Sequence, residues 1–93
     1  MQSSTGTATT EQGSRYLQQL CKHWSHKAEV SLTPEKGEIT FPSGNSLTLQ
    51  ALAGKHEMQA TVPEGGDLVH FQDVVDRHLL RFAFREDLAI IWT

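Results

Sequence analysis

The chain has 93 residues, with 8 Lys and Arg against 11 Asp and Glu, a formal net charge of -3 and a single cysteine. This length fits one small domain, and the negative balance excludes the strongly basic surface that would attract nucleic acid or an anionic membrane. Because the N-terminus lacks the features of a signal peptide, no stretch is apolar enough to span a membrane, and one cysteine suits a reducing compartment, we expect a cytoplasmic protein.

Residues 1–9 are rich in Ser, Thr and Gly, which fits either a disordered tail or a weak edge strand. Thr10 is a suitable helix cap, and Glu11 suits the positive end of a helix dipole. Beyond them, apolar residues recur at i, i+3, i+4 and i+7, which predicts a helix with one buried face: Leu17, Leu20, Cys21 and Trp24.

Alternating apolar and polar residues then predict four strands, each with one buried side. They lie around residues 28–32, 39–41, 47–51 and 58–62, and short turn sequences separate them. A second helix is predicted from its cap, Asp67, to Phe82, with an apolar stripe made of Leu68, Phe71, Val75, Leu79 and Phe82. Residues 88–92 predict a last strand, which could be inserted centrally because apolar residues occupy both of its sides.

These elements predict a fold of the α+β class. Helices with one apolar stripe and strands with one apolar side pack most simply as two layers. We therefore expect a single domain over residues 1–93, a two-layer sandwich in which a mainly antiparallel sheet carries both helices on one face. The element order is (β)-α-β-β-β-β-α-β.

The stretch LCKHWSHK, residues 20–27, raises the question of a metal site. On a regular helix Cys21 and His23 lie about 200° apart, so they cannot share one ion, and Cys21 belongs to the core. The second ligand pair of a zinc finger is absent too. His23 and His26 could approach one ion if the helix continues through His26. Two imidazoles at a helix C-terminus can also simply interact with the negative end of the helix dipole.

Polar residues form a line on each helix, away from the apolar stripe. On the first helix the line holds Tyr16, Gln19, His23 and His26; on the second it holds His70, Arg77 and Arg81, with Asp73 placed to pair with Arg77. A solvated face is the simplest interpretation of the second line. Val69 and Leu80 also lie off the core stripe and could form a small apolar contact surface for a partner subunit.

Three blocks of the sequence carry a family resemblance: SRYLQQLCKHWSHK (14–27), GEITFP (37–42) and RFAFREDLAIIW (81–92). The chain resembles the bacterial family known as domain of unknown function 2218, whose blocks occur in this order. Trp24 stands where the family usually has Phe, and Asp87 where it usually has Glu. The resemblance implies no established activity. It does imply a link to iron or siderophore metabolism, because similar domains occur beside or fused to siderophore-interacting proteins.

Nine polar positions of these blocks are not required by the predicted core and are the candidate site: Arg15, Tyr16, Gln19, His23, His26, Lys27, Arg81, Arg85 and Glu86. Their chemistry suits a small anionic or catecholate-like ligand, in a binding or accessory domain that could also dock on an iron-metabolism protein. As an alternative, His23, His26 and Glu86 could hold iron or zinc as a two-His-one-carboxylate site.

Other interpretations stay open. A His and Glu pair could serve in acid-base catalysis, but no nucleophile elbow, phosphate loop or dinucleotide fingerprint accompanies it, so an enzyme is the less expected class. The polar positions could also form salt bridges and helix caps that serve only the fold, or the domain could act in protein interaction. We expect a monomer or a weak dimer.

Overall fold

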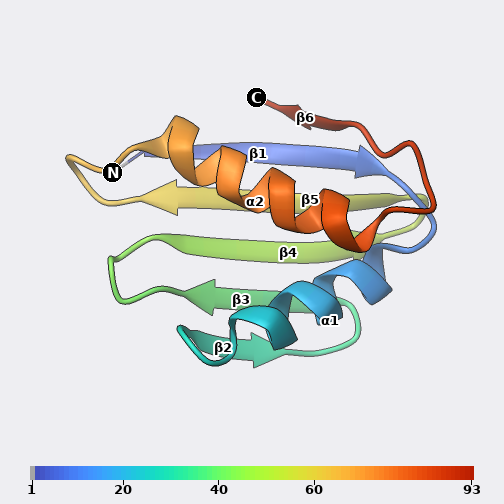
Figure 1. The fold of residues 1–93 in the computed structure, drawn as a ribbon, viewed down its shortest axis with the longest axis horizontal. Helices are drawn as coiled ribbons and strands as arrows, with labels where there is room; N and C mark the ends of the chain where they lie inside the picture. Colours follow the sequence, from blue (N-terminus) through green and yellow to red (C-terminus); the bar gives the residue numbers. More distant parts are fainter. Residues whose placement is uncertain (1) are drawn as a thin grey trace.

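Six strands and two helices follow one another in the predicted order (Figure 1). The structure is a computed structural model and describes residues 2–93, so Met1 of the predicted tail lies outside it. The elements are β1 (Gln2–Thr9), α1 (Gly13–Trp24), β2 (Glu29–Leu32), β3 (Lys36–Thr40), β4 (Ser46–Leu52), β5 (Lys55–Val62), α2 (Leu68–Phe82) and β6 (Ile90–Trp92). All strands pair antiparallel in one sheet of order β2-β3-β4-β5-β1-β6, and both helices cover the same face. The predicted α+β sandwich is confirmed.

The first strand lies inside the sheet, not at its edge. β1 pairs along its whole length with β5 and, at residues 6–8, with β6. The side of β1 that faces the helices carries the small residues Ser4, Gly6 and Ala8, which are buried. β6 is the edge strand, so the central position predicted for the last strand is wrong. Pairing partners so distant in sequence leave no mark on local periodicity.

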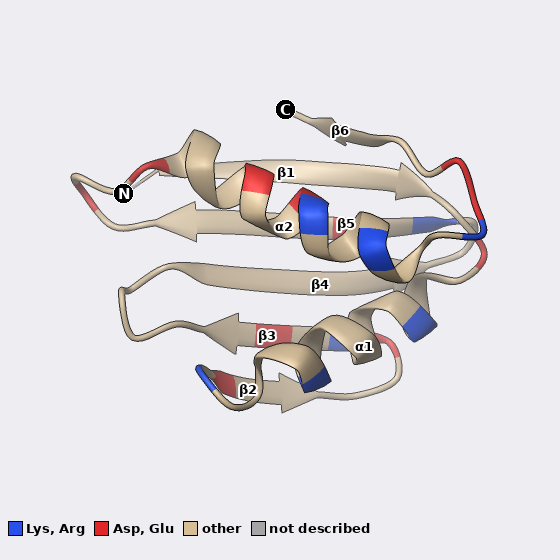
Figure 2. Cartoon of the chain, in the orientation of Figure 1, with Lys and Arg blue, Asp and Glu red and all other residues tan. Residues whose placement is uncertain are grey.

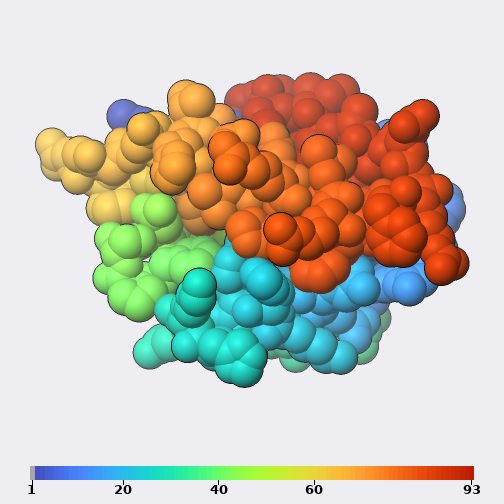
Figure 3. All heavy atoms as spheres, in the orientation of Figure 1, coloured from blue at the N-terminus to red at the C-terminus, as the bar shows by residue number. Residues whose placement is uncertain are grey.

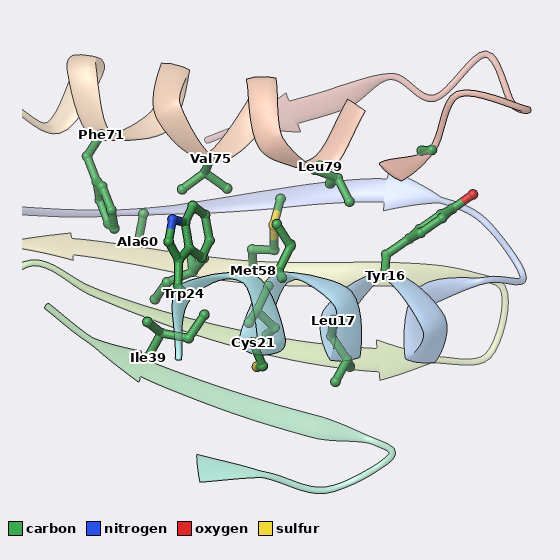
Figure 4. Close-up of a cluster of buried hydrophobic side chains, with 14 of the residues drawn as sticks. Tyr16, Leu17, Cys21, Trp24, Ile39, Met58, Ala60, Phe71, Val75 and Leu79 are labelled. Atoms are coloured by element: carbon green, nitrogen blue, oxygen red, sulfur yellow. The ribbon is translucent and has the colours of Figure 1, made fainter. Parts of the chain in front are cut away.

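The first helix packs its predicted stripe into the core. Leu17, Leu20, Cys21 and Trp24 are at most 5 % exposed. Two expectations for its start are wrong. The helix begins at Gly13, and Gln12, not Thr10, occupies the cap position. The Thr10 hydroxyl accepts a hydrogen bond at 3.0 Å from the Gln12 amide, which lies before the first helical residue. Tyr16, predicted on the polar side, is 4 % exposed. Figure 4 shows its ring lying along the core with the hydroxyl pointing out toward the segment after α2.

The second helix also packs as predicted. The Asp67 carboxylate caps it by accepting from the His70 amide at 3.0 Å, and Phe71, Val75 and Leu79 fill the core beneath it (Figure 4). The predicted ion pair between Asp73 and Arg77 forms at 2.5 Å.

The two exposed aliphatic side chains of α2 do not make one contact surface. Val69 is 75 % exposed and Leu80 is 44 % exposed. Eleven residues along a helix correspond to about 16 Å. Moreover, the exposed ion pair of Asp73 and Arg77 lies between them along the same helix. These are therefore separate exposed residues, which are common on protein surfaces.

The helices touch through an aromatic cluster. The Trp24 ring lies 4.9 Å from that of His78 and 5.4 Å from that of Phe41, and Phe41 in turn packs edge-on against Phe71 at 5.7 Å. Figure 3 shows the side chains of α1 and α2 meeting in a continuous layer over the sheet. Neither helix of residues 2–93 has the length and apolar character needed to cross a membrane.

Candidate functional site

A pocket of about 310 Å³ opens where the start of α1 meets the segment that follows α2. The chain builds it from two distant stretches. One wall carries Glu11, Gln12, Arg15 and Tyr16, and the other carries Phe82, Phe84, Arg85 and Glu86. They come together because α2 ends at Phe82 beside the first turn of α1, so that the chain must pass that turn before it enters β6 (Figure 1).

Glu86 is the centre of the polar contacts in this pocket. Its carboxylate accepts a hydrogen bond from the Tyr16 hydroxyl. The Thr10 hydroxyl lies 3.0 Å from both carboxylate oxygens and donates to them. Burial raises the pKa of Tyr16 to about 12, and the hydrogen bond and negative charge of Glu86 add to that increase. At neutral pH Tyr16 is therefore a protonated donor that holds Glu86 in place.

Two arginines on the walls are without carboxylate partners. The ion pairs within residues 2–93 are Lys36–Glu38, Lys55–Glu57 and Asp73–Arg77. Arg15 and Arg85 are exposed and belong to none of them, even though Glu11 and Glu86 line the same pocket. The Arg85 guanidinium instead lies 5.3 Å from the centroid of the Phe84 ring, a cation-π contact. Figure 2 shows charged segments of both signs gathered at this end of the molecule.

Phe84 forms a solvent-exposed apolar wall of the pocket. Its side chain is 74 % exposed, whereas Phe82 beside it is half-buried against the core. An exposed aromatic ring below a guanidinium offers a surface on which a flat ligand can stack. The pocket thus combines an aromatic face, two unpaired cations and a carboxylate that accepts hydrogen bonds.

A second group of candidate residues lies at the other end of α1. The His23 ring packs against His78, with centroids 4.9 Å apart, and edge-on against Phe82 at 5.9 Å. The His23 side chain is exposed, but partial desolvation against the packed rings, together with electrostatic repulsion from His78, Arg81, Lys27 and His26, lowers the pKa of His23. His26 and Lys27 follow the helix, which ends at Trp24, so they lie in a turn and not on the helical line that the sequence suggested.

The candidate residues therefore divide between two places. Arg15, Tyr16, Arg85 and Glu86 meet in the pocket, while His23, His26, Lys27 and Arg81 lie around the end of α1. Gln19 belongs to neither group: it lines a shallow hollow of about 440 Å³ along α1 that shares Arg15 with the pocket. Its buried Oε1 has no hydrogen-bond partner among the residues that the structure describes.

The two-His-one-carboxylate arrangement is not assembled. Glu86 is engaged with Tyr16 and Thr10, and within residues 2–93 no group of three or more His, Cys, Asp or Glu side chains is arranged to hold a metal ion. The alternative in which Arg15, Arg81, Arg85 and Glu86 form salt bridges is not observed among residues 2–93 either. The Glu86 carboxylate instead accepts hydrogen bonds from the Tyr16 and Thr10 hydroxyls.

Sequence reasoning missed three residues near these sites. The sequence pattern indicates a helix cap at Thr10, although a Thr next to a helix start can equally donate to a distant carboxylate, as Thr10 does to Glu86. Phe84 lies in the RFAFRED block, and its exposure could not be inferred from a segment without periodicity. His78 lies on α2 at a position between the core stripe and the polar line, and only the packing of the two helices brings it to His23.

The fold and the pocket define a class of protein: a small two-layer α+β domain with a ligand-sized pocket at the end of its helical layer. The chain belongs to a bacterial family described as "Uncharacterized protein conserved in bacteria (DUF2218)", which it matches over residues 5–93. It is also similar to the solved NMR structure of PA4090 from Pseudomonas aeruginosa. The identity is 43 %, the TM-score is 0.80, and the match covers 100 % of this chain and 96 % of the other. No match is found among curated proteins.

Proposed function

We propose that this protein is a binding or accessory domain that holds a small anionic ligand in the pocket between α1 and the segment after α2. One observation carries the proposal: Arg15 and Arg85 line the same cavity of about 310 Å³, and neither has a carboxylate partner among residues 2–93. Guanidinium groups recognise carboxylates and phosphates through paired hydrogen bonds, and a ligand oxyanion would supply the partners that the chain does not.

The ring of Phe84 narrows the ligand class. A flat, small organic acid could stack on Phe84 while its acidic group meets an arginine. Catecholates fit this description, and through them the domain would serve iron or siderophore metabolism, as the family resemblance implies. The buried and free Cys21 supports a cytoplasmic setting for that role.

The test is an NMR titration of the labelled protein with benzoate, inorganic phosphate and 2,3-dihydroxybenzoate. We expect saturable shifts at residues 11–16 and 82–86. Replacing Arg15→Gln or Arg85→Gln removes a charge-assisted hydrogen bond, so either change should weaken binding by about tenfold. Arg77→Gln is the matched control, because Arg77 is exposed on the outer side of α2 and pairs with Asp73.

Unchanged affinity in both pocket variants, or an equal loss in the Arg77 variant, would contradict the proposal. Binding of benzoate and phosphate without any preference for the catechol would leave anion binding supported and would remove the siderophore link.

A further inference from the structure

The facing histidines His23 and His78 form a second site, separate from the pocket. His23 lies in the last turn of α1, and His78 lies in the second half of α2. Their ring centroids are 4.9 Å apart with the planes inclined at 50°. The pocket includes neither residue, and the site does not depend on what that pocket binds.

The ring of His78 is held in a fixed tautomer. Its Nδ1 lies 2.7 Å from the Val74 carbonyl oxygen, one helical turn earlier. A carbonyl oxygen can only accept, so Nδ1 carries the hydrogen and donates it. In this tautomer Nε2 keeps its lone pair. Histidines that bind a metal through one ring nitrogen commonly donate the other N–H to a carbonyl oxygen in the same way.

The ring separation is compatible with two imidazoles bound to one ion. With nitrogen-to-metal bonds of about 2.0 Å, each centroid would lie about 3.2 Å from the ion. Centroids 4.9 Å apart then correspond to an angle of about 100° at the ion, within the range of tetrahedral and square geometries. His23 is exposed, so its ring can turn a nitrogen toward His78.

We infer that His23 and His78 together bind a late divalent transition metal ion, of the class of Zn²⁺, Ni²⁺ or Cu²⁺, between the two helices. No third His, Cys, Asp or Glu of residues 2–93 completes the group, so water would occupy the other coordination positions of a bound ion. Trp24 and Phe82, whose rings lie 5.9 Å from that of His23, close one side of the pair.

Neighbouring positive charges set the strength of this site. Arg81 and Lys27 lie close enough to His23 to lower its pKa, and they oppose a divalent cation in the same way. Binding is therefore weaker than at a site with four ligands.

The structure also differs from the sequence expectation in a testable way, since the partner of His23 is His78 on the other helix and not His26.

The test is a Zn²⁺ titration of the full chain, followed through the ring protons of the five histidines by NMR. We expect one equivalent of zinc to shift His23 and His78 selectively. His23→Gln and His78→Gln should each weaken binding by about tenfold or more. His26→Gln and His70→Gln are the controls and should leave it unchanged, because His26 lies in the turn after α1 and His70 is exposed on the first turn of α2.

A second variant separates a metal site from an anion site. Arg81→Gln removes a repulsive charge, so zinc should bind about twofold to fivefold more tightly at low salt. The inference is overturned if zinc binds the His78 variant as it binds the unaltered chain, or if the His26 variant loses the ion. It is equally overturned if phosphate, and not zinc, shifts His23 and this response weakens in the Arg81 variant.

Discussion

His56 is an ionisable residue buried in the core. Its side chain is 0 % exposed on the helix-covered side of β5, and neither ring nitrogen has a hydrogen-bond partner in the part of the chain that the structure describes. Burial lowers the pKa of His56 to about 4. The folded protein therefore keeps this imidazole neutral under conditions in which the unfolded chain, with an ordinary pKa of about 6.5, binds a proton.

The direction of the pH effect follows from these two values. Because the folded pKa is the lower one, the unfolded state takes up the proton first, and stability falls as the pH drops from about 6.5 toward 4. Between pH 7.5 and pH 5, His56 should account for a loss of about 2 kcal/mol in the free energy of unfolding.

His56→Leu should remove this acid sensitivity, because leucine has a similar size and no polar atoms to leave unpaired. Urea unfolding at pH 7.5 and pH 5 measures it: the difference between the two pH values should be about 2 kcal/mol smaller in the variant than in the unaltered chain. His70→Gln, at an exposed position, should keep the original difference. An unchanged difference in the leucine variant would show that His56 is already protonated, or hydrated, in the folded state.

Sequence reasoning could not identify His56 because its predicted strand began at Met58. A histidine that opens an alternating run resembles a polar boundary, and only the pairing of β5 with β1 and β4 places it opposite the small residues Ala8 and Ala51. Tyr16 shows the same limit. Its angle on α1 predicted a polar position, but the segment after α2 covers it through Glu86.

At the level of elements, α1 lies so close to β3 that one position must be glycine. A Cβ atom built on Gly37 would lie 2.6 Å from the Cys21 sulfur and 3.4 Å from Leu49 Cδ1. Both neighbours are buried, so neither can move into solvent. The missing side chain of Gly37 therefore sets the distance between the helix and the sheet, and the Cys21 thiol fills the space above it.

Gly37→Ala should destabilise the fold by about 1–3 kcal/mol, because the added methyl overlaps the sulfur. Cys21→Ala alone should also cost stability, since it leaves a small cavity. Combined, the two changes should cost less than the sum of their separate effects, because the methyl group added at position 37 then occupies the space that the Cys21 sulfur leaves. Urea unfolding of the four proteins measures this coupling. Strictly additive effects would show that Gly37 and Cys21 do not share that space.

The sequence predicted which helices and strands form, but not which parts of the chain each of them contacts. The stripe of α1, the cap and length of α2 and the four middle strands follow from local periodicity and turn residues. The end of α1 at Trp24 was harder to place, because no glycine or proline stops it, and this end moves His26 off the helix. The partners of the site residues, such as Glu86 for Tyr16 and His78 for His23, depend on chain segments that are 70 and 55 positions apart.

At the scale of the whole molecule, the two ends of the chain hold each other in place. β1 lies between β5 and β6, and backbone hydrogen bonds of 3.2 and 2.8 Å join Thr5 and Thr93 in both directions. The first strand therefore completes its pairing only after residues 90–93 have been made, and such distant contacts slow folding. This closure also explains why a Thr-rich segment with a weak burial pattern becomes an interior strand.

Trp92 is the side chain that joins this closure to the helical layer. Its ring lies over Gly6, where an added Cβ would approach it to 2.9 Å, and its Nε1 donates to the Asp76 carboxylate on α2 at 2.9 Å. One residue thus contacts the first strand and the second helix from the edge of the sheet. Ile91 beside it points to the other face and is 66 % exposed.

This pair provides a matched comparison of neighbouring residues in one strand. Trp92→Ala should lower the free energy of unfolding by about 3 kcal/mol, because it removes the packing on Gly6 and leaves the half-buried Asp76 carboxylate without its donor. Ile91→Ala should cost only about 0.5 kcal/mol, since its side chain is mostly in water. Urea unfolding measures both, and amide hydrogen exchange at residues 3–9 should accelerate in the tryptophan variant alone. Equal losses in the two variants would mean that the ladder of β6, and not the Trp92 side chain, holds the ends of the chain together.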